Sequence, residues 1–353
     1  MAIDAAGLDT AVRLVRARNA TAQLVVTRRG QVLADMAFGC TPDALFLIYS
    51  AGKPFIALLV HLLAERGLLS LDDPVALHWR EFAQHGKDAI TIRHVLQHRS
   101  GMPVSGSLLR TVLHLTDWEA SVRDAERGRP RWPAGAVSAY HFMNYGFILG
   151  ELVRRITGTP VRDFMAAELL SPLGLDGIHL GLPASMWARH VPVRAGAPSE
   201  RLNQVLSNRR RLWEAVVPAA SMSGTARQLA RFYQMLLNGG QLDGVRVLAP
   251  QTVAEARRPS NDGEVDAFIK HPVRWAQGFQ LGGPGLDPID LSRVMGSSSS
   301  RDAFGHAGNV SCVTWADPAR QLVLVYLTNV QPPLGEGVRH LGEVSDSVLA
   351  IRE

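Results

Sequence analysis

The sequence predicts a mixed α/β protein in which the two ends of the chain build one antiparallel sheet and helices fill the middle. Apolar and polar residues alternate near the N-terminus and again after about residue 270, whereas helical periodicity dominates from residue 46 to about 240. Strands and helices do not alternate along the chain, which excludes a βαβ arrangement. The 353 residues, 46% of them hydrophobic, suffice for a substantial core.

The expected elements follow this outline from the N-terminus to the C-terminus. An amphipathic helix over residues 5–18 precedes a hairpin over residues 22–39, whose turn lies at the Arg28-Arg29-Gly30 sequence. The strongest helical patterns cover residues 55–67, 92–98, 144–158 and 226–240. Strand patterns return at residues 274–283, 309–317 and 321–330, and residues 336–353 are again helical.

This order predicts two parts, one inserted into the other. Residues 1–58 together with 245–353 are expected to form an α/β sheet domain, with helices packed on the sheet. Residues 59–244 are expected to form an inserted all-helical domain. We expect the functional site to lie in the cleft between the two.

The charge of the chain does not point to nucleic acid. The net charge is +5 and the pI is about 9.6, but the only dense basic run is Asn208–Trp213. No platform of aromatic and basic residues surrounds it. The two cysteines, Cys40 and Cys312, have neither the spacing of metal ligands nor that of a disulfide framework.

Neither a signal peptide nor a membrane helix is predicted. The first twenty residues lack a basic head followed by an apolar stretch. The most apolar run, after Phe46, is interrupted by Lys53, Pro54 and His61 within the length that a membrane helix needs. We therefore expect a cytoplasmic protein without a membrane partner.

That apolar run carries a lysine three residues after a serine. Pro54 fits the first helical turn, where its missing N–H loses no partner, so the helix should start near Ser50. Lys53 then lies on the same face, within reach of the Ser50 hydroxyl. Apolar surroundings lower the pKa of an amine, which lets it act as a base toward a serine nucleophile. The alternative is a plain helix cap beside a surface lysine.

Two later segments supply further polar groups. Tyr140 is expected in a loop just before a helix, where a phenol near Lys53 could relay a proton. The alternative is a core tyrosine. The segment His306-Ala307-Gly308 opens a strand, and the N–H of the next residue, Asn309, could complete an oxyanion hole with the N–H of Ser50. The alternative there is a bulge that glycine permits.

The order and context of these motifs resemble those of the serine β-lactamase and penicillin-binding-protein superfamily. In detail the chain is similar to class C β-lactamase-related esterases, known as family VIII carboxylesterases. The resemblance covers nearly the whole chain and includes residues 93–103, similar to the "LLxHTSGL" segment of that family. It implies the β-lactamase/transpeptidase-like fold and a serine esterase.

The resemblance also implies a role for each residue. Ser50 stands at the acylated nucleophile, Lys53 at its general base, Tyr140 at the tyrosine of the Y-x-N motif and His306–Gly308 at the K-T-G box. Two positions depart from the β-lactamase pattern. Phe142 replaces the asparagine and His306 replaces the lysine, which favours esters over β-lactams.

Several alternatives stay open. An acyltransferase or an amide or β-lactam hydrolase would use the same acyl-enzyme, and a non-catalytic binding protein would be a decayed version of the scaffold. No G-x-S-x-G sequence indicates an α/β-hydrolase. His94 and His98 lack the glutamate of an H-E-x-x-H site, so no metal is predicted.

No organic cofactor is predicted either, and the expected partner is a small-molecule ester or acyl compound. The arginine-rich segment Glu200–Ala215 suggests a lid that meets an acidic acyl-carrier partner, with a solvated helix as the alternative. The sequence does not indicate the acyl group or the oligomeric state.

Overall fold

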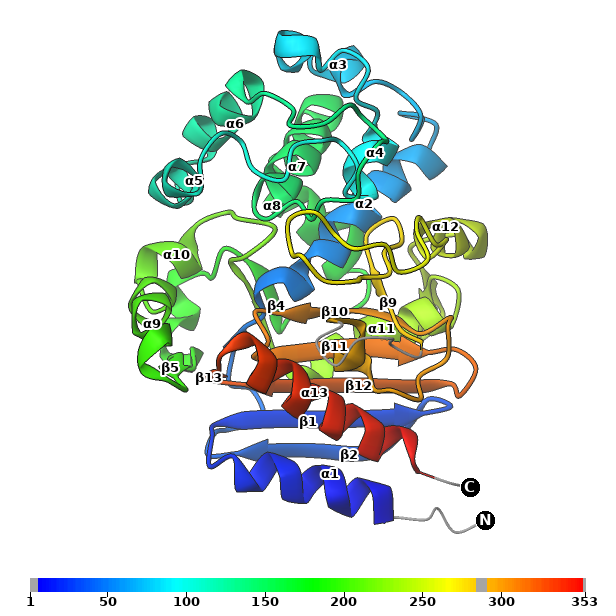
Figure 1. The fold of residues 1–353 in the computed structure, drawn as a ribbon. Coiled ribbons are helices and arrows are strands. Elements are labelled where there is room, and N and C mark those ends of the chain that lie inside the picture. The colour runs from blue at the N-terminus through cyan, green and yellow to red at the C-terminus, as the bar shows by residue number, and fades with distance from the viewer. Residues whose placement is uncertain (1–5, 284–290, 352–353) are drawn as a thin grey trace.

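A six-stranded antiparallel sheet, built from both ends of the chain, forms the base of the molecule (Figure 1). The computed structural model describes residues 6–283 and 291–351. The strand order is β2-β1-β12-β11-β10-β9, so the N-terminal hairpin pairs with the C-terminal strands as predicted. The strands are β1 (Ala22–Arg28), β2 (Gln31–Phe38), β9 (Gln280–Leu281), β10 (Phe304–Gly308), β11 (Cys312–Asp317) and β12 (Leu322–Thr328).

Helices cover both faces of this sheet. Helices α1 (Ala6–Ala17) and α13 (Leu334–Leu349) pack against each other and share one hydrophobic cluster with alternate residues of β1 and β12. The other residues of β12 belong to a second cluster, which extends to α11 (Ala226–Leu237). All of β12 is buried because both faces are covered, which explains its uninterrupted apolar sequence.

The remaining helices lie mostly above the sheet and beside it (Figure 1). They are α2 (Lys53–Glu65), α3 (Val75–His78), α4 (Ile92–Leu96), α5 (Leu108–His114), α6 (Trp118–Arg127), α7 (Asn144–Thr157), α8 (Val161–Met165), α9 (Arg201–Ser207), α10 (Arg210–Glu214) and α12 (Pro250–Ala256). Short strands form three small sheets: β3 (Phe46–Leu47), β6 (Met222–Gly224) and β4 (Ile178–Leu180); β5 (Arg194–Ala195) and β13 (Val330–Gln331); β7 (Gln241–Leu242) and β8 (Val245–Arg246).

One helix from the middle of the chain packs on the sheet. Helix α11 lies within residues 59–244, yet it contacts β1, β11 and β12, and the Tyr233 hydroxyl lies 3.0 Å from the Thr314 Oγ1 of β11. The hydrophobic core also runs continuously from the sheet into α2 and α7. The division at residues 58/59 and 244/245 therefore remains a prediction.

Several predicted elements differ from the observed ones in extent. Of the strand expected at residues 274–283, only Gln280–Leu281 forms β9, because a tight turn in which Ala276 donates to Phe279 interrupts it at Gly278 (φ +121°). The strand expected from residue 309 begins at Cys312, since Asn309 and Val310 have positive φ. The terminal helices are present as α1 and α13; residue 5 and residues 352–353 lie outside the described chain.

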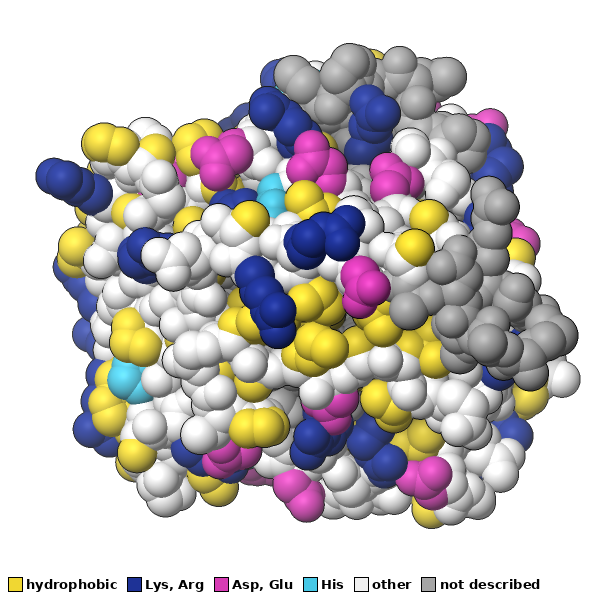
Figure 2. All heavy atoms as spheres, turned by 90° about the horizontal axis from the view of Figure 1, so that it is seen from below, with side chains coloured by type: hydrophobic (Ala, Val, Ile, Leu, Met, Phe, Trp, Pro, Cys, Tyr) yellow, Lys and Arg dark blue, Asp and Glu magenta, His cyan; other side chains and the backbone are white. Residues whose placement is uncertain are grey.

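The lower face of the molecule is formed by α1 and the edge strand β2 (Figure 1). Seen from below, apolar side chains gather there among basic and acidic ones (Figure 2). On β2, Val32 is exposed, whereas Asp35 forms an ion pair with Arg227 of α11 (2.6 Å). Charges on an edge strand discourage pairing with another strand.

Within residues 6–283 and 291–351, no helix combines the length and the apolarity that crossing a bilayer requires.

Candidate active site

Ser50 lies in a short 3₁₀ turn, Tyr49–Gly52, that leads directly into α2. The α-helix itself begins at Lys53 rather than at Ser50, and Pro54 stands in its first turn as expected. Tyr49 has a φ of +49°, a conformation that non-glycine residues rarely adopt. Its hydroxyl is fixed by Ser207 Oγ at 3.0 Å, so the backbone before Ser50 is held in this shape.

The three residues with predicted catalytic roles lie together. Lys53 Nζ lies 3.1 Å from Ser50 Oγ and 2.7 Å from the Tyr140 hydroxyl. The Tyr140 hydroxyl in turn lies 2.7 Å from Ser50 Oγ, which closes a triangle of hydrogen bonds. Lys53 also donates to the backbone carbonyl of Phe142 at 2.9 Å. Tyr140 occupies the loop before α7, as the sequence predicted.

Burial controls the protonation of this triangle. Lys53 is only 1% exposed, and loss of hydration holds the pKa of its amine well below the usual range. Burial also raises the pKa of the Tyr140 phenol, and the charge of Asp266 raises it further. Both shifts favour the uncharged forms, an amine on Lys53 and a phenol on Tyr140.

Tyr140 is held by residues to which no sequence motif pointed. The buried carboxylate of Asp266 accepts hydrogen bonds from the Tyr140 N–H (2.8 Å) and from the indole of Trp275 (3.2 Å). That indole stacks on the phenol ring, with centroids 5.3 Å apart and planes 11° from parallel. The ring of His98 packs against both. Asp266 therefore fixes the backbone and the ring neighbour of Tyr140 together.

His306 lies on β10 and lines the same cavity as Ser50 and Tyr140. Burial, followed by repulsion from Lys53, lowers its pKa to about 3. Its Nδ1 lies 2.7 Å from the Ala307 carbonyl, so this nitrogen carries the proton. Its buried Nε2 has no hydrogen-bond partner among the described residues. The imidazole is neutral and presents no positive charge to a substrate.

Gly308 lies on β10 between Ala307 and Asn309, which line the cavity, but it is not itself among the lining residues. A Cβ built at Gly308 would lie 2.0 Å from the carbonyl oxygen of Ile48. Glycine is therefore needed because β10 lies directly against the backbone that leads to Ser50.

Asn309 lines the cavity together with Ser50 and Ala307. Its carbonyl accepts a hydrogen bond from Gln331 Nε2 (2.9 Å), while Gln331 Oε1 accepts one from the Tyr49 hydroxyl (3.3 Å). The buried Gln331 thus links the residue before Ser50 to Asn309. Sequence reasoning missed Gln331 because nothing in its local sequence shows that β13 ends between these two segments.

A cavity of ≈ 770 Å³ opens in front of Ser50, within the size range of small-molecule sites. Apolar side chains dominate its lining, and the residues come from both predicted parts of the chain. Two groups lie on helices or directly beside them: Thr111–Leu113 of α5 with Leu115–Thr116 after it, and Asn203, Leu206 and Ser207 of α9 with Arg209, Arg211 and Leu212 at the start of α10. The lining also includes Phe142–Met143, Phe268–Ile269, Trp275, Gln280, Val310 and Leu334.

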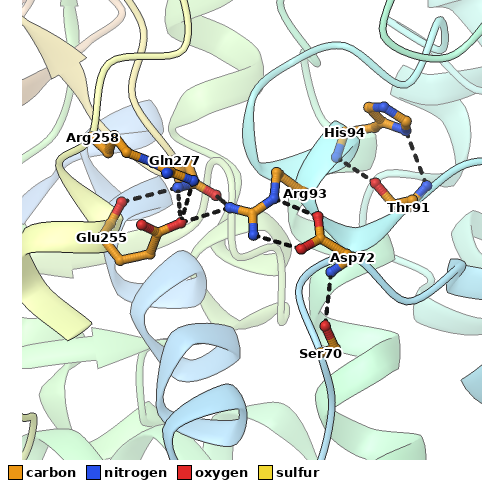
Figure 3. Close-up of polar contacts among 8 residues, drawn as sticks. All are labelled: Ser70, Asp72, Thr91, Arg93, His94, Glu255, Arg258 and Gln277. Carbon is orange, nitrogen blue, oxygen red and sulfur yellow. Dashed lines mark hydrogen bonds and ion pairs between the residues drawn. The ribbon is translucent and has the colours of Figure 1, made fainter. Parts of the chain in front are cut away.

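The two histidines that were considered as metal ligands, His94 and His98, make separate contacts in different places. His94 Nδ1 accepts from the Thr91 N–H and caps α4 (Figure 3). His98 Nδ1 faces His141 Nδ1 at 3.2 Å in the core. Within the described part of the chain, no three His, Cys, Asp or Glu side chains gather in a way that could hold a metal ion.

An antiparallel sheet with flanking helices, and a serine, lysine and tyrosine joined in one hydrogen-bonded network, define a hydrolase of the serine β-lactamase and penicillin-binding-protein superfamily. The family model described as Beta-lactamase matches residues 9–347. The chain therefore belongs to the Beta-lactamase family and is an enzyme of the serine hydrolase class.

Three relatives show where the chain stands within this superfamily. It is 29% identical to the esterase/β-lactamase LipL of Mycobacterium tuberculosis, over 81% of this chain and 70% of that protein. A penicillin-binding-protein homologue from Caulobacter crescentus has a TM-score of 0.83 at 25% identity, with 98% and 97% of the two chains covered. A family VIII carboxylesterase has a TM-score of 0.81 at 26% identity, with 98% of each chain covered.

Proposed function

We propose that this protein hydrolyses carboxylic esters through an acyl-enzyme on Ser50. The observation that carries the proposal is the hydrogen-bonded triangle of the partly exposed Ser50 with the buried Lys53 and Tyr140, in front of an apolar cavity. An uncharged lysine beside a serine hydroxyl is a base placed at hydrogen-bonding distance from its nucleophile. The similarity to LipL, an esterase/β-lactamase, and to a family VIII carboxylesterase supports an ester as substrate.

The reaction begins when Ser50 Oγ attacks the ester carbonyl carbon and Lys53 Nζ takes the serine proton. The N–H groups of Ser50 and Asn309 stabilise the oxyanion. The bond to the alcohol then breaks, and the alkoxide takes the proton from Lys53, relayed by the Tyr140 hydroxyl. A water molecule gives its proton to Lys53 and attacks the acyl-enzyme, and Ser50 recovers its proton as the carboxylic acid leaves.

The cavity favours neutral esters over β-lactams. Its wall carries Phe142 and the neutral His306 where the related β-lactamases have an asparagine and a lysine. A penicillin or cephalosporin would bring a carboxylate that finds no cation at His306 and an amide that finds no side-chain partner at Phe142. Unmatched polar groups reduce transition-state binding.

Transfer of the acyl group to an acceptor other than water is the alternative outcome of the same chemistry. The arginine-rich segment supports this alternative, because Arg209 and Arg211 line the cavity and would meet an acidic acyl carrier. Adding an alcohol acceptor to the assay would reveal such a transferase as an ester product formed at the expense of the free acid.

The test of the proposal uses Ser50→Ala protein. We expect the variant to keep its thermal unfolding temperature while losing nearly all hydrolysis of p-nitrophenyl butyrate, a fall of at least about 10³-fold. A fluorophosphonate probe should label the wild type and not the variant. Retained hydrolysis in purified Ser50→Ala protein would refute the assignment.

Lys53→Arg tests the base separately. A guanidinium cannot give up its proton, so the rate should fall about as far as in Ser50→Ala. In the wild type, kcat/KM should fall as the pH drops through the lowered pKa of Lys53, because the protonated amine cannot accept the serine proton. A rate that depends on pH identically in the wild type and in Lys53→Arg would show that another group is the base.

A further inference from the structure

Helix α5 carries an apolar surface that the protein itself does not cover. None of its seven residues is buried, and Leu109 and Leu113 are 71% and 69% exposed. Val112 is 43% exposed. The helix is held by its polar residues, since Arg110 and His114 both pair with Asp124. Core packing therefore does not explain the leucines.

Two of these exposed residues belong to the cavity in front of Ser50. Val112 and Leu113 line it from the α5 side. On the other side, Leu206 of α9 lines it, and Leu202 on the preceding turn of the same helix is 70% exposed. Helices α5 and α9–α10 lie on the same side of the molecule, one above the other (Figure 1). The apolar surface thus continues from the cavity outward onto both helices.

The cavity is larger than a short acyl group requires. At ≈ 770 Å³ it lies in the upper part of the range that holds drug-sized ligands. An acetyl or butyryl group bound on Ser50 would leave Val112, Leu113 and Leu206 in contact with water. An elongated apolar ligand would cover them and gain binding free energy in proportion to the area buried.

We propose that the substrate is an ester with an extended apolar chain, which leaves the Ser50 region between α5 and α9–α10. This inference rests on the ester hydrolysis proposed above and specifies its substrate class. Arg209 and Arg211 are the charged residues that line the cavity within the described part of the chain, and no carboxylate lines it. The far end of the substrate's apolar chain is therefore neutral or anionic, and a cationic end group on the substrate is disfavoured.

A series of p-nitrophenyl esters from acetate to octanoate tests the proposal, at concentrations below micelle formation. We expect kcat/KM to rise roughly two- to fourfold for each added methylene, since full burial of one methylene corresponds to about fourfold. Leu113→Ser should reduce kcat/KM for octanoate roughly tenfold more than for acetate. Leu77→Ser is the matched control, because Leu77 is 67% exposed on α3 and does not line the cavity.

The outcomes separate the substrate class from the reaction. A flat or falling chain-length profile in a protein whose activity depends on Ser50 would overturn the apolar chain and leave the esterase intact. So would a Leu113→Ser variant that affects both esters equally. Activity that appears only above the critical micelle concentration would assign the surface to a lipid interface instead. A Leu113-dependent dimer in light scattering would assign it to a second copy of the chain. A wild-type protein that hydrolyses neither the acetate nor the octanoate ester would refute the proposed function itself.

Discussion

At the scale of single residues, the site is defined by two basic side chains whose uncharged forms are favoured by burial. Lys53 and His306 lie in or beside one cavity, and burial lowers the pKa of both side chains. Because burial lowers the pKa of the histidine to about 3, its imidazole is neutral near pH 7. A lysine in its place, reaching toward the cavity, would bring a positive charge to the substrate.

This difference predicts substrate choice. In the wild type, kcat/KM for a butyrate ester should exceed that for nitrocefin by on the order of a hundredfold, the effect of one missing contact to a carboxylate. His306→Lys should narrow the gap by improving nitrocefin and impairing the ester. The comparison requires four kcat/KM values, two substrates in two proteins. Nitrocefin turnover by the wild type that equals its ester turnover would show that His306 does not discriminate.

Local spacing made part of the site predictable. Ser50 and Lys53 are three residues apart at a helix start, so their contact follows from helix geometry alone. The contact of Tyr140 with both, ninety positions away from Ser50 in the chain, was inferred from family resemblance and not from spacing. Asp266 and Gln331 were missed, because each acts through a long-range contact and lies in a segment without a motif.

At the scale of elements, the site depends on how closely β10 approaches the turn that carries Ser50. A Cβ at Gly308 would overlap the Ile48 carbonyl oxygen at 2.0 Å and the Cys312 Sγ at 2.6 Å. Neither atom can move freely, since the Ile48 oxygen belongs to the backbone and the Cys312 side chain is buried on β11. The distance between Ser50 and Asn309 is therefore set by a residue that does not line the cavity.

We accordingly expect Gly308→Ala to displace β10 from the serine turn. kcat/KM for the butyrate ester should fall roughly a hundredfold, as a displacement of about 1 Å at reacting groups can produce. Stability should fall by about 1–3 kcal/mol from overpacking. Gly335→Ala, in the first turn of α13 with no atom within 4 Å of the added Cβ, is the control and should be neutral or slightly stabilising. Wild-type activity in Gly308→Ala would mean that the strand position does not control the site.

The elements themselves were predictable to different degrees. The hairpin of β1 and β2 and the strands β11 and β12 follow from alternation and from long apolar runs. The segment before β9 has a similar composition but folds as turns, since the indole of Trp275 donates to Asp266 and a tight turn forms at Gly278. The placement of α11 on the sheet depends on tertiary packing, which periodicity alone does not specify.

At the scale of the whole molecule, one arginine joins distant parts of the chain near the site (Figure 3). Arg93 of α4 binds Asp72 through two nitrogens (2.6 and 2.9 Å). It also binds Glu255 of α12 (2.6 Å) and the side chain of Gln277 (2.8 Å). Gln277 lies two residues after Trp275, which stacks on Tyr140. Arg93 thereby connects the helices above the sheet to the segment that supports the tyrosine.

Arg93→Ala should therefore lower stability and activity together. Removing the guanidinium leaves the half-buried Glu255 carboxylate and the buried Gln277 amide with fewer partners, and we expect a loss of about 2 kcal/mol in urea unfolding. A several-fold fall in kcat should accompany it as the support of Tyr140 loosens. Arg258→Ala is the matched control: Arg258 pairs with the same Glu255 oxygen at 2.8 Å but is 57% exposed, so its loss should cost less than about 0.5 kcal/mol. Equal effects of the two substitutions would show that Arg93 contributes only a surface ion pair.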